Sequence, residues 1–258
     1  MTILYNVDNH IARVTIDRPQ AMNAIDSDSD AELRRIWADV EQRGDIRVVV
    51  LTGSGDRAFC AGADLKNGSS LKGVDYWATA QPGGFGGIAL NDTLNVPVIA
   101  RVNGLALGGG FEMVLGCDIV VACEESAFGL PEPRVGRLPL DGGMVLLTRQ
   151  IPYRQAMGML LTAQRVDAKR ALEMGLVNEV VSRSDLNIAV ERWIEQILSC
   201  APLSLRAIKS VVHQTAHLPA AQAQAMRLPA LTAALRSVDS IEGVRAFREK
   251  RRPDWQGQ

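Results

Sequence analysis

Two glycine-rich turns hold the residues whose types and spacing suggest chemistry. The first is RAFCAGADLKNG, residues 57–68, and the second is VNGLALGGGFEMVLGCDI, residues 102–119. Each follows a β-like run, and turns made of Gly and Ala leave backbone N–H groups uncovered, which suits phosphate binding or stabilisation of an oxyanion. The second turn lacks the lysine of a GxxxxGK[ST] loop and the full GxGxxG spacing, and Glu112 would repel a phosphate. The turns therefore favour a carbonyl oxygen that gains negative charge.

Two glutamates accompany these turns. Glu112 lies three residues after Gly109, and Glu132 follows a proline in AFGLPEPRVGRLPLDGG, residues 127–143. A carboxylate beside an oxyanion hole can act on water, or on an acidic C–H next to the polarised carbonyl. Taken singly, a glycine run is most often a tight turn and a lone glutamate usually faces solvent. Together, two carboxylates and two N–H turns predict acid–base chemistry at a carbonyl.

Composition narrows the class of protein. The chain has 258 residues, 47% of them hydrophobic, and a formal net charge of −1, which suits a globular protein with a large core and no basic stripe for nucleic acid. The N-terminus alternates polar and apolar residues as a strand does, and no apolar run is long enough for a membrane span. The cysteines are scattered without a CxxC pair or a nearby histidine, which predicts free thiols, a cytoplasmic location and no metal site. They are Cys60, Cys117, Cys123 and Cys200.

Strands and a few helices alternate over the first 150 residues. Strands are expected at 3–7 and 12–17 and over RVVVLTGSG, VPVIARVNG and DIVVACE, with a short helix over GGFEMVLGC. A longer helix has Leu33, Ile36, Trp37 and Val40 at i, i+3, i+4 and i+7, after a Ser/Asp-rich start that can cap it. This order predicts an α/β protein with a largely parallel sheet.

The later part of the chain is mostly helical. Helices are expected at 154–161, 168–174, 186–200, 203–216, 220–235 and 241–250. The residue pattern becomes helical throughout near residue 190, and no linker separates the two parts. The helical part is therefore expected to dock on the core or on a neighbouring subunit. Earlier in the chain, residues 67–87 contain QPGGFGG and few periodic apolar residues, which predicts a mobile loop or an irregular helix beside the site.

Three segments, AFCAGADLK, VNGLALGGGFE…CDIVVA and AFGLPEPRVGRLPLDGG, resemble the signatures of the enoyl-CoA hydratase/isomerase, or crotonase, superfamily. The resemblance runs from Asn6 to the closing AFREKRRPDW. It implies the crotonase (ClpP-like) spiral fold of repeated β-β-α units, with a core at 1–190 for coenzyme A and the active site. Residues 191–258 would form a helical region that builds a homotrimer or homohexamer.

The resemblance also implies roles for individual residues. The N–H groups of Ala63 and Gly109 would form the oxyanion hole, Glu112 would activate water for attack at C3, and Glu132 would give a proton to C2. The acyl pocket would include Trp77, Phe85, Leu140 and Asp141. Lys66, Arg18 and Lys250 have the charge for the phosphates of coenzyme A, with solvated surface as the alternative for each. Coenzyme A would contact Met22, Ala24, Ala61, Ala63, Asp64, Leu65 and Lys66, and Phe247 and Lys250 of a neighbouring subunit.

Within the superfamily the nearest resemblance is to the carnitinyl-CoA dehydratase, or crotonobetainyl-CoA hydratase, group. QPGGFGGI, LPEPRVGRLPLDGGMVLL and IEGVRAFREKRRPDWQG look like its segments. An aromatic face of Trp77 or Phe85 could hold a quaternary ammonium, or both rings could merely anchor a flap. One departure is PLDGG, where hydratases usually have PGAGG. We expect Asp141 to cap the helix that starts at Gly142, the alternative being a third carboxylate that raises the pKa of its neighbours.

The function that these residues imply is reversible addition of water to the 2,3-double bond of an acyl-CoA thioester, without a metal or redox cofactor. The presence of both glutamates favours hydration, because isomerases of the superfamily often keep only one. A thioester hydrolase that uses Glu112 or Asp141 to direct water at the carbonyl is a further alternative. A non-enzymatic RNA-binding member is the alternative from another class, and both glutamates and the near-neutral charge argue against it.

Overall fold

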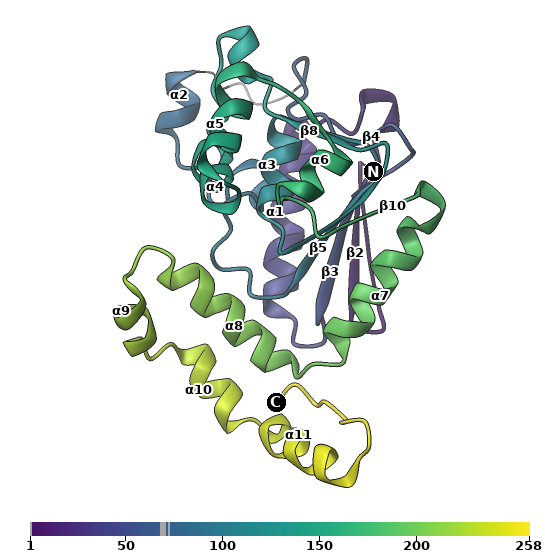
Figure 1. Cartoon of the computed structure of the whole chain (residues 1–258), viewed down its shortest axis with the longest axis vertical. Helices are drawn as coiled ribbons and strands as arrows, with labels where there is room; N and C mark the ends of the chain where they lie inside the picture. The colour runs from purple at the N-terminus through teal and green to yellow at the C-terminus, as the bar shows by residue number, and fades with distance from the viewer. Residues whose placement is uncertain (1, 68–70, 72) are drawn as a thin grey trace.

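The computed structural model describes residues 2–67, 71 and 73–258, and it contains two sheets with helices packed around them (Figure 1). The larger sheet has the order β1-β2-β3-β5-β7-β10 and the smaller one β4-β6-β8-β9. The strands of the larger sheet are β1 (Ile3–Asp8), β2 (Ile11–Ile16), β3 (Val48–Gly53), β5 (Val98–Val102), β7 (Ile119–Cys123) and β10 (Glu179–Val181). Those of the smaller sheet are β4 (Ala58–Cys60), β6 (Leu105–Leu107), β8 (Ala127–Gly129) and β9 (Val166–Asp167).

Successive units of the chain each place one strand in each sheet. β3 is followed by β4, β5 by β6 and β7 by β8, and neighbouring units pair parallel. A helix follows each pair of strands: α2 (Val74–Ala78), α3 (Gly109–Leu115) and α4 (Gly143–Gln150), in that order. The repeated strand, strand and helix units match the predicted spiral, with β1 and β2 as an antiparallel pair at the sheet edge.

The larger sheet is buried on both faces, as β3 illustrates. Its side chains alternate between two cores: Val49 and Leu51 join the one that contains α1 (Ser27–Gln42) and α3. Val48 and Val50 join the second, which α7 (Leu186–Leu198) covers. This explains the continuous apolar run of β3, and it confirms the predicted buried strand.

The predicted helix at the start of the first core is confirmed as α1. The Asp26 carboxylate accepts a hydrogen bond from the Ser29 N–H at 2.9 Å and so caps the helix. Its apolar positions are buried as their spacing predicted, and they are Leu33, Ile36, Trp37 and Val40.

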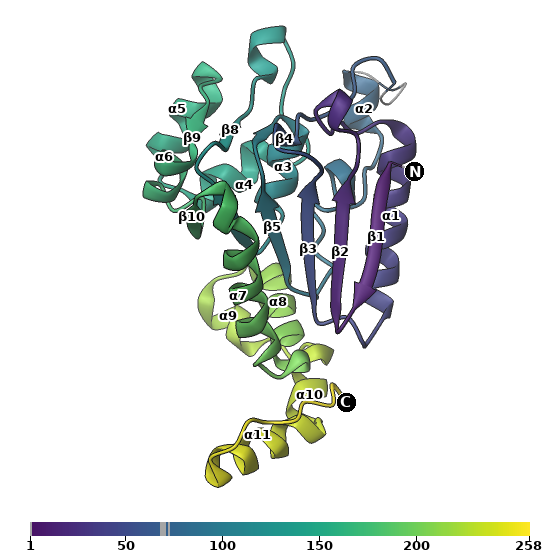
Figure 2. The same cartoon turned by 90° about the vertical axis from the view of Figure 1, so that its right-hand side faces the viewer.

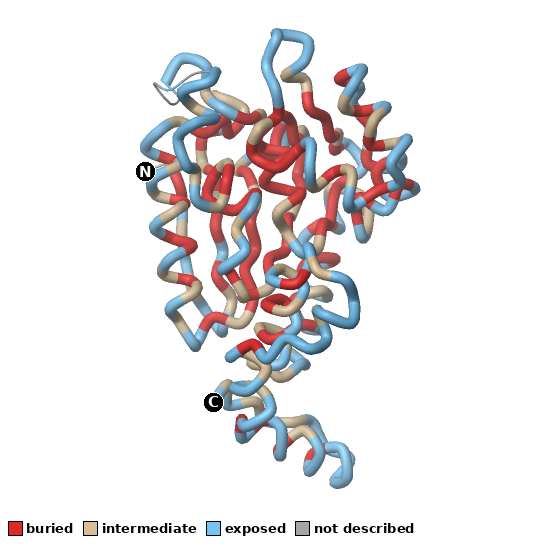
Figure 3. Tube along the Cα trace, turned by 90° about the vertical axis from the view of Figure 1, so that its left-hand side faces the viewer, coloured by how far each residue is buried: buried red, intermediate tan, exposed pale blue. Residues whose placement is uncertain are grey.

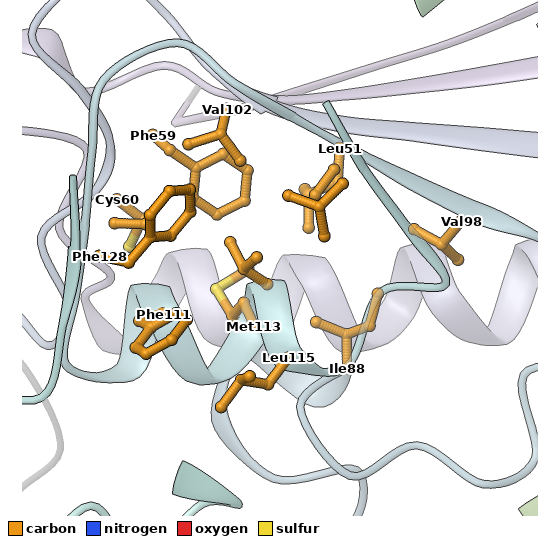
Figure 4. Close-up of a cluster of buried hydrophobic side chains, with 14 of the residues drawn as sticks. Leu51, Phe59, Cys60, Ile88, Val98, Val102, Phe111, Met113, Leu115 and Phe128 are labelled. Carbon is orange, nitrogen blue, oxygen red and sulfur yellow. The ribbon is translucent and has the colours of Figure 1, made fainter. Parts of the chain in front are cut away.

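Helix α3 is buried at every residue and is the central element of the site. Phe111, Met113 and Leu115 belong to a buried cluster that also includes Phe128 and Phe59 (Figure 4). The rings of Phe111 and Phe128 lie 5.7 Å apart between centroids, in a tilted arrangement. Burial of each such side chain stabilises the fold by roughly 1.5–3 kcal/mol, so this packing fixes the helix that carries Glu112.

The C-terminal helices extend away from the sheets (Figure 2). The buried Lys209 on α8 donates to Asp118 Oδ2 at 2.6 Å and to the Val96 carbonyl at 2.9 Å, which ties this region to the core. The single helix predicted at 220–235 is wrong: two helices form because Leu228 precedes Pro229 and is extended (ψ 141°). The helices here are α8 (Pro202–Thr215), α9 (Ala220–Ala225), α10 (Pro229–Arg236) and α11 (Val238–Glu249).

The degree of burial differs between the sheets and the C-terminal helices. Buried residues concentrate in the sheets and around α3, whereas the last helices are largely exposed or intermediate (Figure 3). Residue 190, where the sequence texture changes, is buried within α7, and the division there stays a prediction. The remaining elements are α5 (Tyr153–Thr162), α6 (Ala168–Glu173) and the 3-10 turns η1 (Pro19–Ala21), η2 (Phe85–Gly87), η3 (Glu132–Val135) and η4 (Arg183–Asp185).

Three further expectations can be compared with the described residues. The segment expected to be a loop or an irregular helix at 67–87 contains α2 and η2, while its positions 68–70 and 72 lie outside the described residues. The four cysteines are free. None of the helices in the described part of the chain combines the length and apolar character needed to cross a membrane.

Candidate active site

The two glycine turns lie against each other. Gly62, one residue before Ala63, has φ +93°, and a Cβ placed on it would come within 3.2 Å of the Gly109 nitrogen. Gly109 is the first residue of α3, so no earlier turn of the helix uses its N–H. Within the described part of the chain, neither this N–H nor that of Ala63 has a hydrogen-bond partner. The fold therefore brings together the two donors that the sequence predicted.

A short parallel bridge sets the direction of the Ala63 N–H. The Ile25 N–H donates to the Gly62 carbonyl at 2.9 Å, and the Asp64 N–H donates to the Ile25 carbonyl at 2.8 Å. Because a parallel bridge of this kind uses the groups on either side of Ala63, its own N–H points away from Ile25. That direction leaves the N–H available to a substrate oxygen.

Close backbone packing holds the second turn in place. A Cβ on Gly110 would lie 2.1 Å from the Cys60 carbonyl oxygen, far inside van der Waals contact. Only glycine lets the start of α3 approach the end of β4 this closely. The distance between the two turns thus depends on Gly110.

Glu112 is buried, with 2% of its surface exposed. Its Oε1 accepts hydrogen bonds from the backbone N–H groups of Asp141 at 2.9 Å and Gly143 at 2.8 Å. Burial raises the pKa of Glu112 to about 8, the Gly143 N–H opposes the rise, and the negative charges of Asp141 and Glu132 add to it. A carboxyl group that gains and loses a proton near neutral pH suits acid–base catalysis.

Glu132 lies next to the same turn. It begins η3, and a Cβ on Gly108 would lie 2.8 Å from its Oε1. Its Oε2 is buried and has no hydrogen-bond partner among the described residues. Burial raises the pKa of Glu132, and so does the charge of Asp141, while a hydrogen bond to its own backbone lowers it. The fold therefore brings both predicted glutamates to the two N–H turns.

The interpretation of Asp141 as a helix cap is wrong. Gly142 occupies the N-cap position of α4, and no side chain caps that helix. Asp141 instead accepts a 2.7 Å hydrogen bond at Oδ2 from the hydroxyl of Tyr76 on α2. Burial raises the pKa of Asp141, and the Tyr76 hydrogen bond opposes the rise. Asp141 is thus a third carboxylate beside Glu112, as the alternative interpretation proposed.

The other residues predicted for the acyl pocket differ in how close they lie to this centre. The Phe85 ring rests on Gly109, because a Cβ on that glycine would lie 2.6 Å from Phe85 Cδ1. Leu140 is half-buried and adjoins Asp141. Trp77 is 71% exposed, so within one chain it does not join the enclosed part of the site.

The residues predicted to bind coenzyme A surround the first turn. The Ala61 N–H donates to the Met22 carbonyl at 3.1 Å, which brings these two segments together. Asp64 folds the following turn, since its Oδ1 accepts the N–H groups of Lys66 at 2.9 Å and of Asn67 at 3.2 Å. These hydrogen bonds and the one from Arg18 lower the pKa of Asp64 to about 2. Ala24 is buried, whereas Leu65 and Lys66 are exposed.

Arg18 does not offer its charge to a phosphate. It is only 9% exposed, and its guanidinium pairs with Asp64 at 2.9 Å and with Asp26 at 3.1 Å. It also donates to the Ala24 carbonyl. The prediction for Arg18 is therefore wrong, because its guanidinium is buried and two carboxylates already balance its charge.

Phe247 and Lys250 lie far from these residues within one chain. α11 stands at the opposite end of the molecule from α2 and α3 in both views (Figures 1 and 2). Phe247 is 85% exposed, and Lys250 ends α11 with φ +54°. Their contribution from a neighbouring subunit stays a prediction.

Sequence reasoning missed Tyr76 and the two backbone groups that hold Glu112. Tyr76 and Trp77 are adjacent on a one-turn helix, so they point about 100° apart and only one of them can face the site. The sequence shows this aromatic pair, but it does not show which of the two side chains faces the site. No group of three or more His, Cys, Asp or Glu side chains within the described ranges is arranged to hold a metal ion.

The raised pKa of Glu112 predicts how stability depends on pH. Folding raises this pKa from about 4.5 to about 8, so the folded state binds the proton more tightly between these values. The stabilisation is complete below pH 4.5 and is lost as pH rises through 8, by on the order of a few kcal/mol. We expect urea unfolding at pH 5 and pH 9 to show Glu112→Gln gaining stability relative to wild type at the higher pH. An equal difference at both pH values would contradict the assignment.

Known proteins resemble this chain over nearly its whole length. The family model for enoyl-CoA hydratase/isomerase matches residues 6–258. Carnitinyl-CoA dehydratase of Citrobacter koseri is 38% identical over 251 residues, which cover 96% of this chain and 95% of that protein. The protein of the same name from Escherichia coli K12 is 37% identical with the same coverage.

Solved structures agree with the sequence comparisons. The enoyl-CoA hydratase from Bacillus anthracis superposes with a TM-score of 0.90 and 31% identity, covering 100% of both chains. That from Mycobacterium tuberculosis H37Rv has a TM-score of 0.88 and 32% identity, covering 100% of this chain and 99% of the other. These comparisons agree with the spiral arrangement of the two sheets.

Proposed function

Since the chain belongs to the enoyl-CoA hydratase/isomerase family, we propose that it is a hydro-lyase that adds water reversibly to the 2,3-double bond of an acyl-CoA thioester. The observation that carries this proposal is the meeting of the buried Glu112 carboxylate and the half-buried Glu132 carboxylate with two N–H groups that have no partner among the described residues. Retention of both carboxylates supports hydration over isomerisation, which needs one base.

In the proposed mechanism the N–H groups of Ala63 and Gly109 bind the thioester oxygen. As the water oxygen bonds to C3, one water proton passes to the Glu112 carboxylate, and the carboxylic acid of Glu132 gives its proton to C2. The two donors stabilise the enolate-like state that forms during the addition. One such donor commonly lowers the activation barrier by on the order of 3 kcal/mol. Proton exchange between the two carboxyl groups and solvent restores the starting state. Because the addition of water to the double bond needs no oxidant or reductant, we propose that no cofactor is needed beyond the coenzyme A of the substrate.

The relatives' names suggest the acyl group. The name carnitinyl-CoA dehydratase denotes a substrate whose four-carbon acyl group ends in a quaternary ammonium. We propose that the present protein accepts acyl groups of that kind. We further propose that Met22, Ala24 and residues 61–66 line the coenzyme A site, apart from the buried Arg18 nearby. The free thiols fit a reducing compartment, which supports a cytoplasmic location.

A spectrophotometric assay tests the proposed function. Hydration removes the conjugation of the enoyl thioester and bleaches its ultraviolet absorbance, whereas hydrolysis releases a free thiol that a disulfide reagent detects. We expect bleaching without thiol release on crotonyl-CoA or crotonobetainyl-CoA. Thiol release at the rate of bleaching would instead identify a hydrolase, and double-bond migration without water uptake an isomerase.

We propose that the protein assembles as a trimer or hexamer through its C-terminal helices. Several large apolar side chains are exposed on α10 and α11, and they include Leu235, Ile241, Val244 and Phe247. An exposed apolar patch of this kind marks an interaction surface. We expect light scattering to give three or six times the chain mass of 27.9 kDa. The double variant Ile241→Glu/Phe247→Glu should give smaller species and bind coenzyme A more weakly, and a wild-type monomer would contradict the proposal.

A further inference from the structure

Asp141 is a buried carboxylate without a cationic partner. It is 8% exposed, and its one side-chain hydrogen bond among the described residues comes from the neutral Tyr76 hydroxyl at 2.7 Å. No ion pair within the described ranges includes it. A buried carboxylate is costly unless a positive charge or several hydrogen bonds compensate it. The site therefore retains an uncompensated negative charge.

Arg34, whose charge lowers the pKa of Asp141, does not supply that compensation. Arg34 acts on Asp141 through space, but its guanidinium is paired with Asp30 at 2.7 Å and donates to the Gly84 carbonyl at 2.9 Å. It donates to the Pro82 carbonyl as well. The positive charge of Arg34 lowers the pKa of Asp141, and the negative charge of Asp30 raises it. A full positive charge for Asp141 would thus have to come from outside the chain.

Asp141 acts electrostatically on both glutamates of the site. The charges of Asp141 and Glu132 both raise the pKa of Glu112, and that of Asp141 raises the pKa of Glu132, so the three carboxylates lie within electrostatic reach of one another. Glu132 Oε2 is a buried oxygen with no hydrogen-bond partner in the described part of the chain. Such a cluster repels an anion and favours a cation by the same interaction.

Asp141 lies where the far end of an acyl chain would reach. Glu112 follows Gly109 by about one helical turn, and the Asp141 N–H donates to Glu112 Oε1 at 2.9 Å. An acyl chain whose thioester carbonyl binds at Gly109 and whose C3 lies beside Glu112 therefore continues toward Asp141. The backbone carbonyl oxygen of Asp141 lies near Gly84, the neighbour of Phe85, so an aromatic ring borders the same space.

We propose that Asp141 is a specificity-determining residue that selects acyl groups bearing a positive charge beyond C3, with Tyr76 holding its carboxylate in place. The inference rests on the proposed function and deepens it, because it assigns the recognition of charge to one side chain. A cation beside Asp141 compensates the buried charge that the chain itself leaves unpaired. A neutral acyl group of the same shape gains nothing from it.

Two substrates of matched shape test the inference. They are 4-trimethylammoniobut-2-enoyl-CoA and its carbon isostere 5,5-dimethylhex-2-enoyl-CoA, and the readout is the ratio of their kcat/KM values. We expect the wild-type ratio to favour the cation by at least about tenfold and Asp141→Asn to lower it by about 10- to 100-fold. Asp141→Glu, which keeps the charge, should retain more of the preference than Asp141→Asn. Asp92→Asn, which removes an exposed carboxylate, should leave the ratio within about twofold of wild type.

The outcomes separate this inference from the proposed function. If Asp141→Asn hydrates both substrates with the wild-type ratio, the inference is overturned and the proposed function stands. If wild-type protein hydrates neither, the proposed function fails, and binding then decides the inference. Calorimetry on wild type with the saturated analogues 4-trimethylammoniobutanoyl-CoA and 5,5-dimethylhexanoyl-CoA should show about tenfold tighter binding of the cation. Equal affinities would overturn the inference even if no Asp141 variant folds.

Discussion

Replacing either glutamate of the site with glutamine should lower kcat by about two to four orders of magnitude. Glutamine keeps the shape of the side chain but can neither accept the water proton at Glu112 nor deliver a proton at Glu132. At Glu112 the amide oxygen can still accept the N–H groups of Asp141 and Gly143, so the loop that ends at α4 should keep its position. Substrate binding should change little, because the donors of Ala63 and Gly109 remain.

Initial rates of enoyl-CoA hydration measure this effect, with Glu124→Gln as a control for loss of an exposed carboxylate. If the two glutamates act as a unit, the double variant should lose much less than the product of the two single losses. Full activity in Glu112→Gln together with an inactive Asp141→Asn would move the base to Asp141. That result would make a hydrolase or another lyase the better assignment.

Gly110→Ala should have the second large effect, on the fold and on the rate together. The added methyl group would meet the Cys60 carbonyl oxygen at 2.1 Å, and the next nearest atoms are the carbonyl carbon and Cβ of the same residue, so no flexible side-chain end could move aside. Either α3 moves away from β4 or the variant does not fold, and we expect a loss of at least about 3 kcal/mol in the free energy of unfolding. Separation of the two turns would also remove the shared oxyanion site, so any folded fraction should be nearly inactive.

Gly158→Ala is the matched control, because it adds the same methyl group inside α5. Nothing lies within 4 Å of the new atom, so we expect this variant to be more stable by about 0.5–1 kcal/mol with unchanged activity. Denaturant unfolding and hydration rates measured on both variants give the comparison. Wild-type stability in Gly110→Ala would contradict the close approach of α3 and β4.

The meeting of the two glycine turns with the two glutamates could be predicted from the sequence because local residue patterns mark them. Glycine runs after strands and glutamates at fixed offsets are visible in the chain, and the resemblance supplied the tertiary contact between Gly109 and Ala63. Helix α1 followed from its apolar spacing and its acidic start. Each of these features depends on residues that are close together in the sequence, or on a fold already known for the whole chain.

The Tyr76–Asp141 hydrogen bond could not be predicted, because it joins residues 65 positions apart. Tyr76 lies on a five-residue helix with no buried residue, where periodicity is too short to show which side chain faces the core. The acidic residue before a helix is common as a cap, and that general preference gave the wrong role for Asp141. Arg18 failed for a related reason: a sequence shows a cation but not the carboxylates that fold onto it.

The bridge between Ile25 and Ala63 makes the number of residues in the first turn matter more than their side chains. Two backbone hydrogen bonds fix this register, and each neighbour along the chain points its N–H to the opposite side. One residue inserted between Cys60 and Ala63 would turn the Ala63 N–H toward Ile25. The N–H of a different residue would then face the substrate. Substitutions at Ala61 or Ala63 leave the direction of that donor unchanged. At Ala61 and Ala63 the oxyanion site therefore tolerates variation in side chains far better than insertion or deletion, whereas Gly62, with φ +93°, must stay glycine.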